Sequence, residues 1–236
     1  MDIIIILLVV LASLSLFKTK GNNHSNHNNH NNHENHDNNE TGQKYENVIK
    51  KKLENIFKIP IYSNILVKNS ETDMCFVTNK GIFVTECKYR YAGPTLYVRH
   101  CDGSASFLNA EDTGNPLSQN IRHIEVMSEA LNISKDILFN IIITTARVEY
   151  KFLGKTLTTK NDGLINKLKG MRLAFVTYND GKTLIEEKID GMSLFKEAVD
   201  KLPDILSDEE VEKYREIISS YQISEEEMIA FKNRFK

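Results

Sequence analysis

Two carboxylates and a lysine, Asp73, Glu86 and Lys88, are spaced so that one β-hairpin would bring them to the same patch. Two short, apolar, β-prone stretches carry them, and a turn signal at residues 79–81 separates these stretches. Like charges held close together repel, so a partly buried pair of acids needs a compensating cation. Two acids and a lysine on one patch indicate the chemistry of a metal-dependent phosphodiesterase.

The register of this hairpin depends on the length of its loop. A two-residue loop sets Asp73 opposite Glu86, with their Cβ atoms roughly 4.5–5.5 Å apart. Lys88 then lies on the face of Glu86, because side chains alternate along a strand. A three-residue loop would set Asp73 against Cys87 instead, unless a bulge restored the pairing.

A Glu-x-Lys pattern is also common as a solvated pair on an exposed edge strand. Here apolar residues occupy both faces of the two stretches, which is typical of central strands in a covered sheet. A covered sheet favours a site over an exposed edge, but the residues alone leave both interpretations open.

Length and composition indicate one main domain with appendages. The 236 residues carry a formal net charge of −2. Residues 42–190 hold 21 Lys and Arg against 17 Asp and Glu, whereas residues 191–236 hold 7 against 11. The mildly basic core is compatible with a polyanionic partner without requiring one. The three cysteines have no C-x-x-C spacing, which argues against a disulfide framework and a zinc knuckle.

The first segment, residues 1–20, is predicted to be an N-terminal hydrophobic anchor or signal segment. Its apolar run, residues 3–17, would span roughly 22 Å as a helix, short of the roughly 30 Å hydrocarbon core. Lys18 and Lys20 follow this run, whereas export signals carry their positive charges before it. We therefore expect a retained membrane anchor with the rest of the chain in the cytoplasm, and secretion as the minor alternative.

Residues 21–41 form a tract rich in Asn and His. Its apolar content is too low to offset the entropy of ordering, so a disordered tether is predicted. A weak site for zinc, nickel or copper is the alternative, because five histidines recur at every third position. These are His24, His27, His30, His33 and His36.

The remaining pattern predicts an α/β fold, because helices and strands alternate along the chain. A main α/β domain is predicted over residues 42–190 and an acidic, C-terminal helical extension over residues 191–236. Predicted helices cover residues 44–57, 115–131, 192–202, 208–221 and 224–235, and predicted strands or hairpins cover 61–67, 73–88, 96–107, 138–145 and 173–177. The first helix places Glu46 within its apolar arc, where a carboxylate needs a cation or donor.

The helix after Asn115-Pro116 combines a capping residue with a proline in the first turn. Apolar periodicity predicts that one face is buried, and Gln119, Arg122 and His123 cluster on another. The predicted buried residues are Leu117, Ile121, Ile124 and Leu131.

Four elements in this order resemble the nuclease-related domain, NERD, a branch of the PD-(D/E)XK or restriction-endonuclease-like superfamily. They are Gly42-x-x-x-Glu46, then Asp73, then Gly-Ile-Phe-Val-x-Glu-x-Lys over residues 81–88, then Asn115-Pro116-x-x-Gln119. The resemblance covers about residues 42–145. Two family features are absent, since Tyr45 stands where a glycine is usual and the chain has no Trp.

The resemblance implies a restriction-endonuclease-like core with a central mixed sheet flanked by helices, and divalent-metal nuclease chemistry on DNA. By position, Asp73 and Glu86 match the family's metal-ligating acids, and Glu46 matches the acid on the first helix. Lys88 and Gln119 match the family's lysine and the glutamine after Asn-Pro.

From these residues we expect a membrane-tethered nuclease that uses Mg²⁺ (or Mn²⁺). Arg122 and His123, one turn beyond Gln119, would contact DNA phosphates, so little base specificity is expected, with RNA as an open alternative. A catalytically inactive module that binds nucleic acid or protein on the same fold is the alternative function. The complete set of acids and lysine favours the enzyme, because a binder has no need to oppose carboxylates to approaching phosphates.

Overall fold

The structure is a computed structural model. It describes residues 31–89, 95–99, 104–107, 115–145, 147–152, 155–158, 165–168, 171–178 and 191–234. The predicted anchor, residues 3–17, lies outside these ranges. Within the described ranges, no helix is both long and apolar enough to cross a membrane. The chain divides into two units, residues 1–38 and 39–236, and the fold below is that of the second unit.

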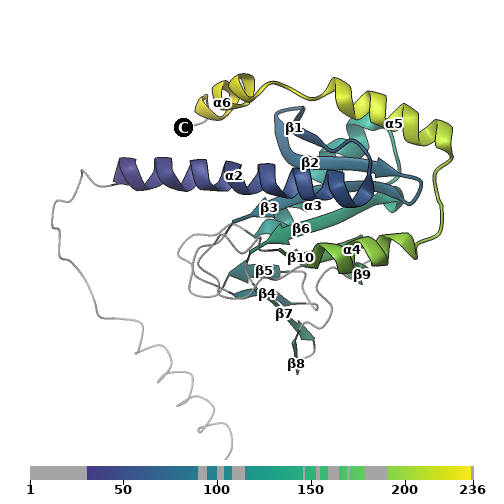
Figure 1. Cartoon of the computed structure of the whole chain (residues 1–236), viewed down its shortest axis with the longest axis horizontal. Helices are drawn as coiled ribbons and strands as arrows, with labels where there is room; N and C mark the ends of the chain where they lie inside the picture. Colours follow the sequence, from purple (N-terminus) through teal and green to yellow (C-terminus); the bar gives the residue numbers. More distant parts are fainter. Residues whose placement is uncertain are drawn as a thin grey trace, which may run out of the picture. The chain divides into compact units, whose positions relative to one another are not determined.

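A mixed six-stranded sheet forms the centre of this unit, in the order β1-β2-β3-β6-β10-β9 (Figure 1). Its strands are β1 (Tyr62–Val67), β2 (Ser70–Thr78), β3 (Gly81–Lys88), β6 (Leu138–Thr144), β10 (Met171–Thr177) and β9 (Ile165–Leu168). The pairs β3–β6 and β6–β10 are parallel and the other pairs are antiparallel. Every residue of β3 except Lys88 is buried, as its apolar character on both faces predicts.

A second sheet of four strands has the order β5-β4-β7-β8. Its strands are β5 (Ser104–Phe107), β4 (Thr95–Arg99), β7 (Arg147–Phe152) and β8 (Lys155–Thr158). The predicted hairpin over residues 96–107 is therefore confirmed as β4 and β5. The strands β7, β8 and β9 were not predicted from the sequence.

Helices cover both faces of the central sheet, giving the predicted α/β fold with a core consistent with the restriction-endonuclease-like class (Figure 1). Buried side chains of α2 (Asn31–Phe57) and α4 (Gly191–Asp200) pack on one face. Those of α3 (Pro116–Leu131) and α5 (Asp208–Ser220) pack on the other face. The last helix, α6 (Glu225–Asn233), lies beside β1.

Helix α2 begins at Asn31, well before the predicted start at Lys44. The structure thus differs from the predicted disordered tether over residues 31–41. Burial of Tyr45, Ile49 and Leu53 against the sheet offsets the cost of nucleating the helix. The Asn, His, Asp and Gly residues that precede them are weak helix formers, which is why the sequence pattern predicted a later start. No proline interrupts the chain between residues 31 and 44.

The extension predicted over residues 191–236 is part of this compact unit. Met192, Phe195 and Val199 of α4 join the core on the α2 side of the sheet. Leu206, Val211 and Ile218 join the core on the α3 side, so the extension completes both faces.

The same segment covers the edge strand β1. The backbone N–H of Leu66 donates to the carbonyl of Tyr221 at 3.0 Å, and that of Ile223 donates to Asn64 at 3.0 Å. The Gln222 amide also donates to the Ser63 carbonyl at 2.9 Å. These bonds satisfy backbone groups that an edge strand would otherwise leave unpaired.

Candidate active site

The hairpin of β2 and β3 has the two-residue loop and the register that the sequence predicts. Thr78 pairs with Gly81 and Met74 with Thr85, so the next opposed positions outward are Asp73 and Glu86. Gly81 has φ +136°, and a Cβ atom there would lie 2.6 Å from Cε2 of Phe139. The turn therefore requires glycine, and it fixes the spacing of the two acids.

Asp73 lies at the point where the ladder between β2 and β3 ends. Its Oδ2 accepts a hydrogen bond of 2.7 Å from the backbone N–H of Cys87. The carboxyl group thus ties β2 to β3 beside Glu86.

Glu86 is the most deeply buried acid of the group, with 1% of its side chain exposed. Its Oε1 lies 2.7 Å from Nζ of Lys88, whereas its buried Oε2 makes no hydrogen bond. Lys88 Nζ also donates to Oε1 of Gln119 at 3.2 Å. Three of the predicted site residues thus form one connected chain from β3 to α3.

Two of the acids, Asp73 and Glu46, have a raised pKa. Burial raises the pKa of the Asp73 carboxyl well above its ordinary value, and the charges of Glu86 and Glu46 raise it further. Burial also raises the pKa of Glu46 to about 7; nearby Lys232 opposes this, while Glu71 and Glu86 add to it. Deprotonated together, these groups crowd negative charge that a cation would relieve.

Lys232 brings a second cation to the acids from α6, outside the segment that suggested the site. Its Nζ lies 2.5 Å from Oε1 of Glu71. Burial lowers the pKa of Lys232, but the hydrogen bond to Glu71 and the charges of Glu71, Glu46 and Asp73 outweigh it, so the pKa is raised. The sequence offered no local signal for this contact, which joins residues far apart in the chain.

Helix α3 begins as predicted. Oδ1 of Asn115 accepts hydrogen bonds from the backbone of Leu117 at 3.0 Å and Ser118 at 3.1 Å, and Pro116 occupies the first turn. Its buried face differs from the prediction, however, because it contains Asn120 and His123.

Hydrogen bonds account for the two polar residues on that face. Asn120 Nδ2 contacts the carbonyl of Val84 and Oδ1 of Asn140, both at 2.9 Å. His123 Nδ1 lies 2.8 Å from Oγ of Ser70. The prediction that His123 contacts DNA phosphates therefore fails, because its ring is buried behind Glu86, whereas Arg122 is exposed.

The residues present fit a divalent metal in part. Among the described residues, no group of three or more His, Cys, Asp or Glu is arranged to hold a metal ion. Mg²⁺ commonly uses one or two carboxylates and keeps several waters. The buried Oε2 of Glu86 lacks a hydrogen bond, and residue Asp73 lies opposite residue Glu86 on the neighbouring strand, so the carboxylates of these two acids suit such an ion.

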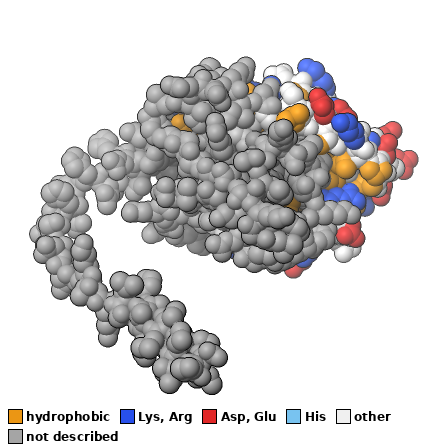
Figure 2. Space-filling view, turned by 90° about the horizontal axis from the view of Figure 1, so that it is seen from below, with side chains coloured by type: hydrophobic (Ala, Val, Ile, Leu, Met, Phe, Trp, Pro, Cys, Tyr) orange, Lys and Arg blue, Asp and Glu red, His pale blue; other side chains and the backbone are white. Residues whose placement is uncertain are grey.

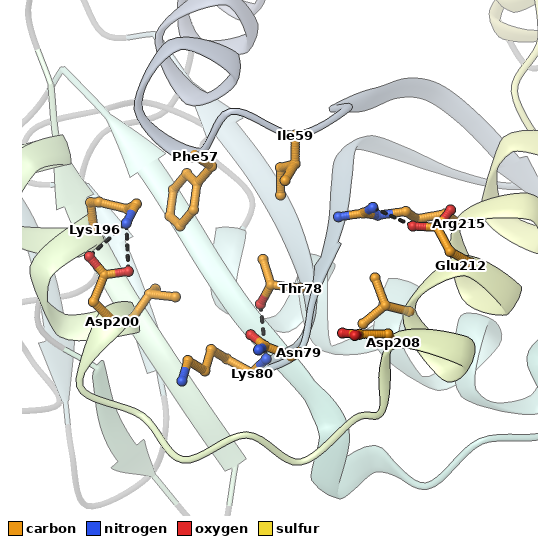
Figure 3. A pocket seen from close by; sticks show the side chains of 12 residues that line it. Phe57, Ile59, Thr78, Asn79, Lys80, Lys196, Asp200, Asp208, Glu212 and Arg215 are labelled. Carbon is orange, nitrogen blue, oxygen red and sulfur yellow. Dashed lines mark hydrogen bonds and ion pairs between the residues drawn. The ribbon is translucent and has the colours of Figure 1, made fainter.

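A hollow of about 350 Å³ lies at the other end of the hairpin, between the β2–β3 turn, α4 and α5 (Figure 3). Its cations are engaged, since Lys80 pairs with Asp204 and Lys196 with Asp200. Arg215 pairs with Glu212 in the same way. This hollow is therefore separate from the acids and offers no ready anion site.

The described surface in Figure 2 also lacks a patch of one charge. Lys and Arg side chains alternate there with Asp and Glu, and hydrophobic side chains lie between them.

Comparison with known proteins points to one family. The family model of the nuclease-related domain matches residues 41–147. No curated protein and no solved structure matches the chain. The matched segment contains Glu46, Asp73, Glu86, Lys88 and Gln119. The predicted resemblance to the nuclease-related domain (NERD) is therefore confirmed over this segment, which is a little under half of the chain.

Proposed function

We propose that this protein is a divalent-metal-dependent nuclease that hydrolyses DNA phosphodiester bonds with little base specificity. One observation carries the proposal. The carboxylate of Glu86 is buried at the end of β3, in the position opposite Asp73; one of its oxygens pairs with Lys88 at 2.7 Å and the other makes no hydrogen bond. Burying a charge in this way is costly, so such an arrangement favours a functional site over a structural one.

Asp73 and Glu86 would hold Mg²⁺ or Mn²⁺, and Glu46 would act on it through water or through its charge. The ion supplies Lewis-acid polarisation of the phosphoryl group and a lower pKa for a bound water. The raised pKa values of Asp73 and Glu46 support this assignment, because a cation favours their charged forms.

Lys88 would stabilise the reacting phosphate and orient the attacking water. Its ammonium group lies between Oε1 of Glu86 and Oε1 of Gln119, which fixes it at the end of β3. A positive charge held in this way needs little rearrangement as negative charge develops on phosphate oxygens. Gln119 and exposed Arg122 would contact the backbone phosphates, which carry no sequence information.

The test uses the purified full chain with plasmid and single-stranded DNA, in Mg²⁺, Mn²⁺ or EDTA. We expect metal-dependent cleavage that is lost in Glu86→Gln and in Lys88→Ala. Glu197→Gln and Lys135→Ala, which change exposed residues outside the site, are the matched controls and should cleave like the wild type. Circular dichroism of each variant checks that the fold is retained.

The inactive binding module predicts a different result. No form would cleave DNA under any condition, while DNA binding would persist in the wild type. That outcome would rule out the enzyme and leave nucleic-acid binding as the function of the domain.

Membrane attachment through residues 3–17, with the domain in the cytoplasm, completes the proposal. The lysines that follow the apolar run support this orientation. Fractionation of cells that express the full chain, followed by protease treatment of intact spheroplasts, tests it. Release of the chain into the medium would instead support secretion.

A further inference from the structure

Glu86 and His123 each place one buried polar atom at the contact between them. Oε2 of Glu86 lies 3.4 Å from Nε2 of His123, and neither atom makes a hydrogen bond. The Glu86 side chain is 1% exposed and the His123 side chain 10%. Water therefore has little access to either atom, and each depends on the other to offset the cost of its burial.

Ser70 contacts the other ring nitrogen of His123. Its Oγ lies 2.8 Å from Nδ1 of the ring. When the Ser70 hydroxyl donates to Nδ1, the proton of a neutral ring is on Nε2 and points toward the Glu86 carboxylate. The other tautomer would set a nitrogen lone pair against a carboxylate oxygen, so the carboxylate favours the first.

The three residues come from three separate elements. Ser70 begins β2 directly after a tight turn in which Lys68 and Asn69 both have positive φ, 45° and 63°. His123 lies in the third turn of α3, and Glu86 lies near the end of β3. Contacts among these three residues connect the start of β2, helix α3 and the end of β3, which together carry the candidate site.

We propose that Ser70 and His123 are positioning residues that hold the Glu86 carboxylate in one orientation toward the metal and Lys88. Ser70 fixes the imidazole ring, and the Nε2–H of His123 restrains Oε2 from behind. Each carboxylate oxygen has two lone pairs, so this contact leaves Oε2 able to bind a cation. The inference deepens the proposed function and rests on it for the role of the metal.

The first measurement requires neither metal nor DNA. A long-range ¹H–¹⁵N spectrum of the full chain reports which ring nitrogen is protonated, and the His123 signals are assigned by their loss in His123→Gln. We expect a proton on Nε2 and a shift toward the other tautomer in Ser70→Ala. A wild-type ring protonated on Nδ1 alone would overturn the inference.

The second measurement is the affinity for Mn²⁺ alone, by electron paramagnetic resonance. Loss of outer contacts to a metal ligand commonly weakens metal binding by about 10–100-fold, and we expect this in His123→Leu. His123→Gln, which restores an N–H donor, should recover most of the affinity, and Ser70→Ala should show a smaller loss. Glu125→Gln, an exposed change on the same helix, is the control.

A structural role alone would give a different pattern. His123→Leu would then lower the unfolding temperature while the folded protein kept wild-type Mn²⁺ affinity and kcat, which would overturn the inference. If the wild type neither binds Mn²⁺ nor cleaves DNA, the proposed function fails. The tautomer of His123 and its response to Ser70→Ala then still decide whether the pair restrains Glu86.

Discussion

The raised pKa of Glu46 makes the stability of this domain depend on pH in a defined direction. Its carboxyl has a pKa of about 7 in the folded chain against an ordinary value of 4.5. Between these values the folded state holds a proton that the unfolded state releases. The contribution of Glu46 to stability therefore falls as pH rises through this range.

The size of this effect follows from the shift. Each pKa unit corresponds to about 1.4 kcal/mol, so ionising Glu46 costs the folded state about 3 kcal/mol by pH 8. Glu46→Gln removes the titration, and we expect the variant to gain about 3 kcal/mol over the wild type between pH 4 and pH 8. The Glu46 charge also raises the pKa of Asp73, so removing that charge makes ionised Asp73 less costly and stabilises the folded variant further.

Urea unfolding followed by circular dichroism, in EDTA, measures this difference. The chain has no Trp, so backbone ellipticity is the more direct probe. Glu197→Gln, an exposed change on α4, controls for the loss of one negative charge. If the wild-type and Glu46→Gln stabilities stay parallel from pH 4 to pH 8, the argument that burial and neighbouring acids raise this pKa is refuted.

Three further outcomes are expected. Asn120→Ala should cost about 1–3 kcal/mol in urea unfolding, because buried acceptors on β3 and β6 lose their donor. Gly81→Ala should cost about 1–3 kcal/mol from backbone strain, and more from the clash with Phe139, visible as a lower melting temperature. Lys232→Ala should raise the pKa of Glu46 above about 7, because a cation that lowers it is lost; carboxyl titration by nuclear magnetic resonance measures this.

The hairpin and its acids could be predicted because their geometry is local. The register of β2 and β3 follows from a two-residue loop that only glycine closes, and alternation then places Glu86 and Lys88 on one face. The start of α3 is equally local, since Asn115 caps it through neighbouring backbone groups.

What the sequence could not predict depends on distant partners. The strands β7, β8 and β9 are short, and each depends on a neighbouring strand: β7 pairs with β4, β8 with β7 and β9 with β10. A helical wheel predicts that His123 faces solvent, because it takes no account of the contacts with Ser70 on β2 and Glu86 on β3. Lys232 reaches Glu71 only because the end of the chain folds back along β1.

That return of the chain to β1 has a consequence for how the protein is made. The strand is synthesised early, but its backbone partners at residues 221–223 come about 150 residues later. At typical translation rates of about 5–20 residues per second, β1 waits roughly 8–30 s with its edge open. During that interval the nascent chain is the form most exposed to edge-to-edge association. A stop codon anywhere before residue 221 would make this transient exposure permanent.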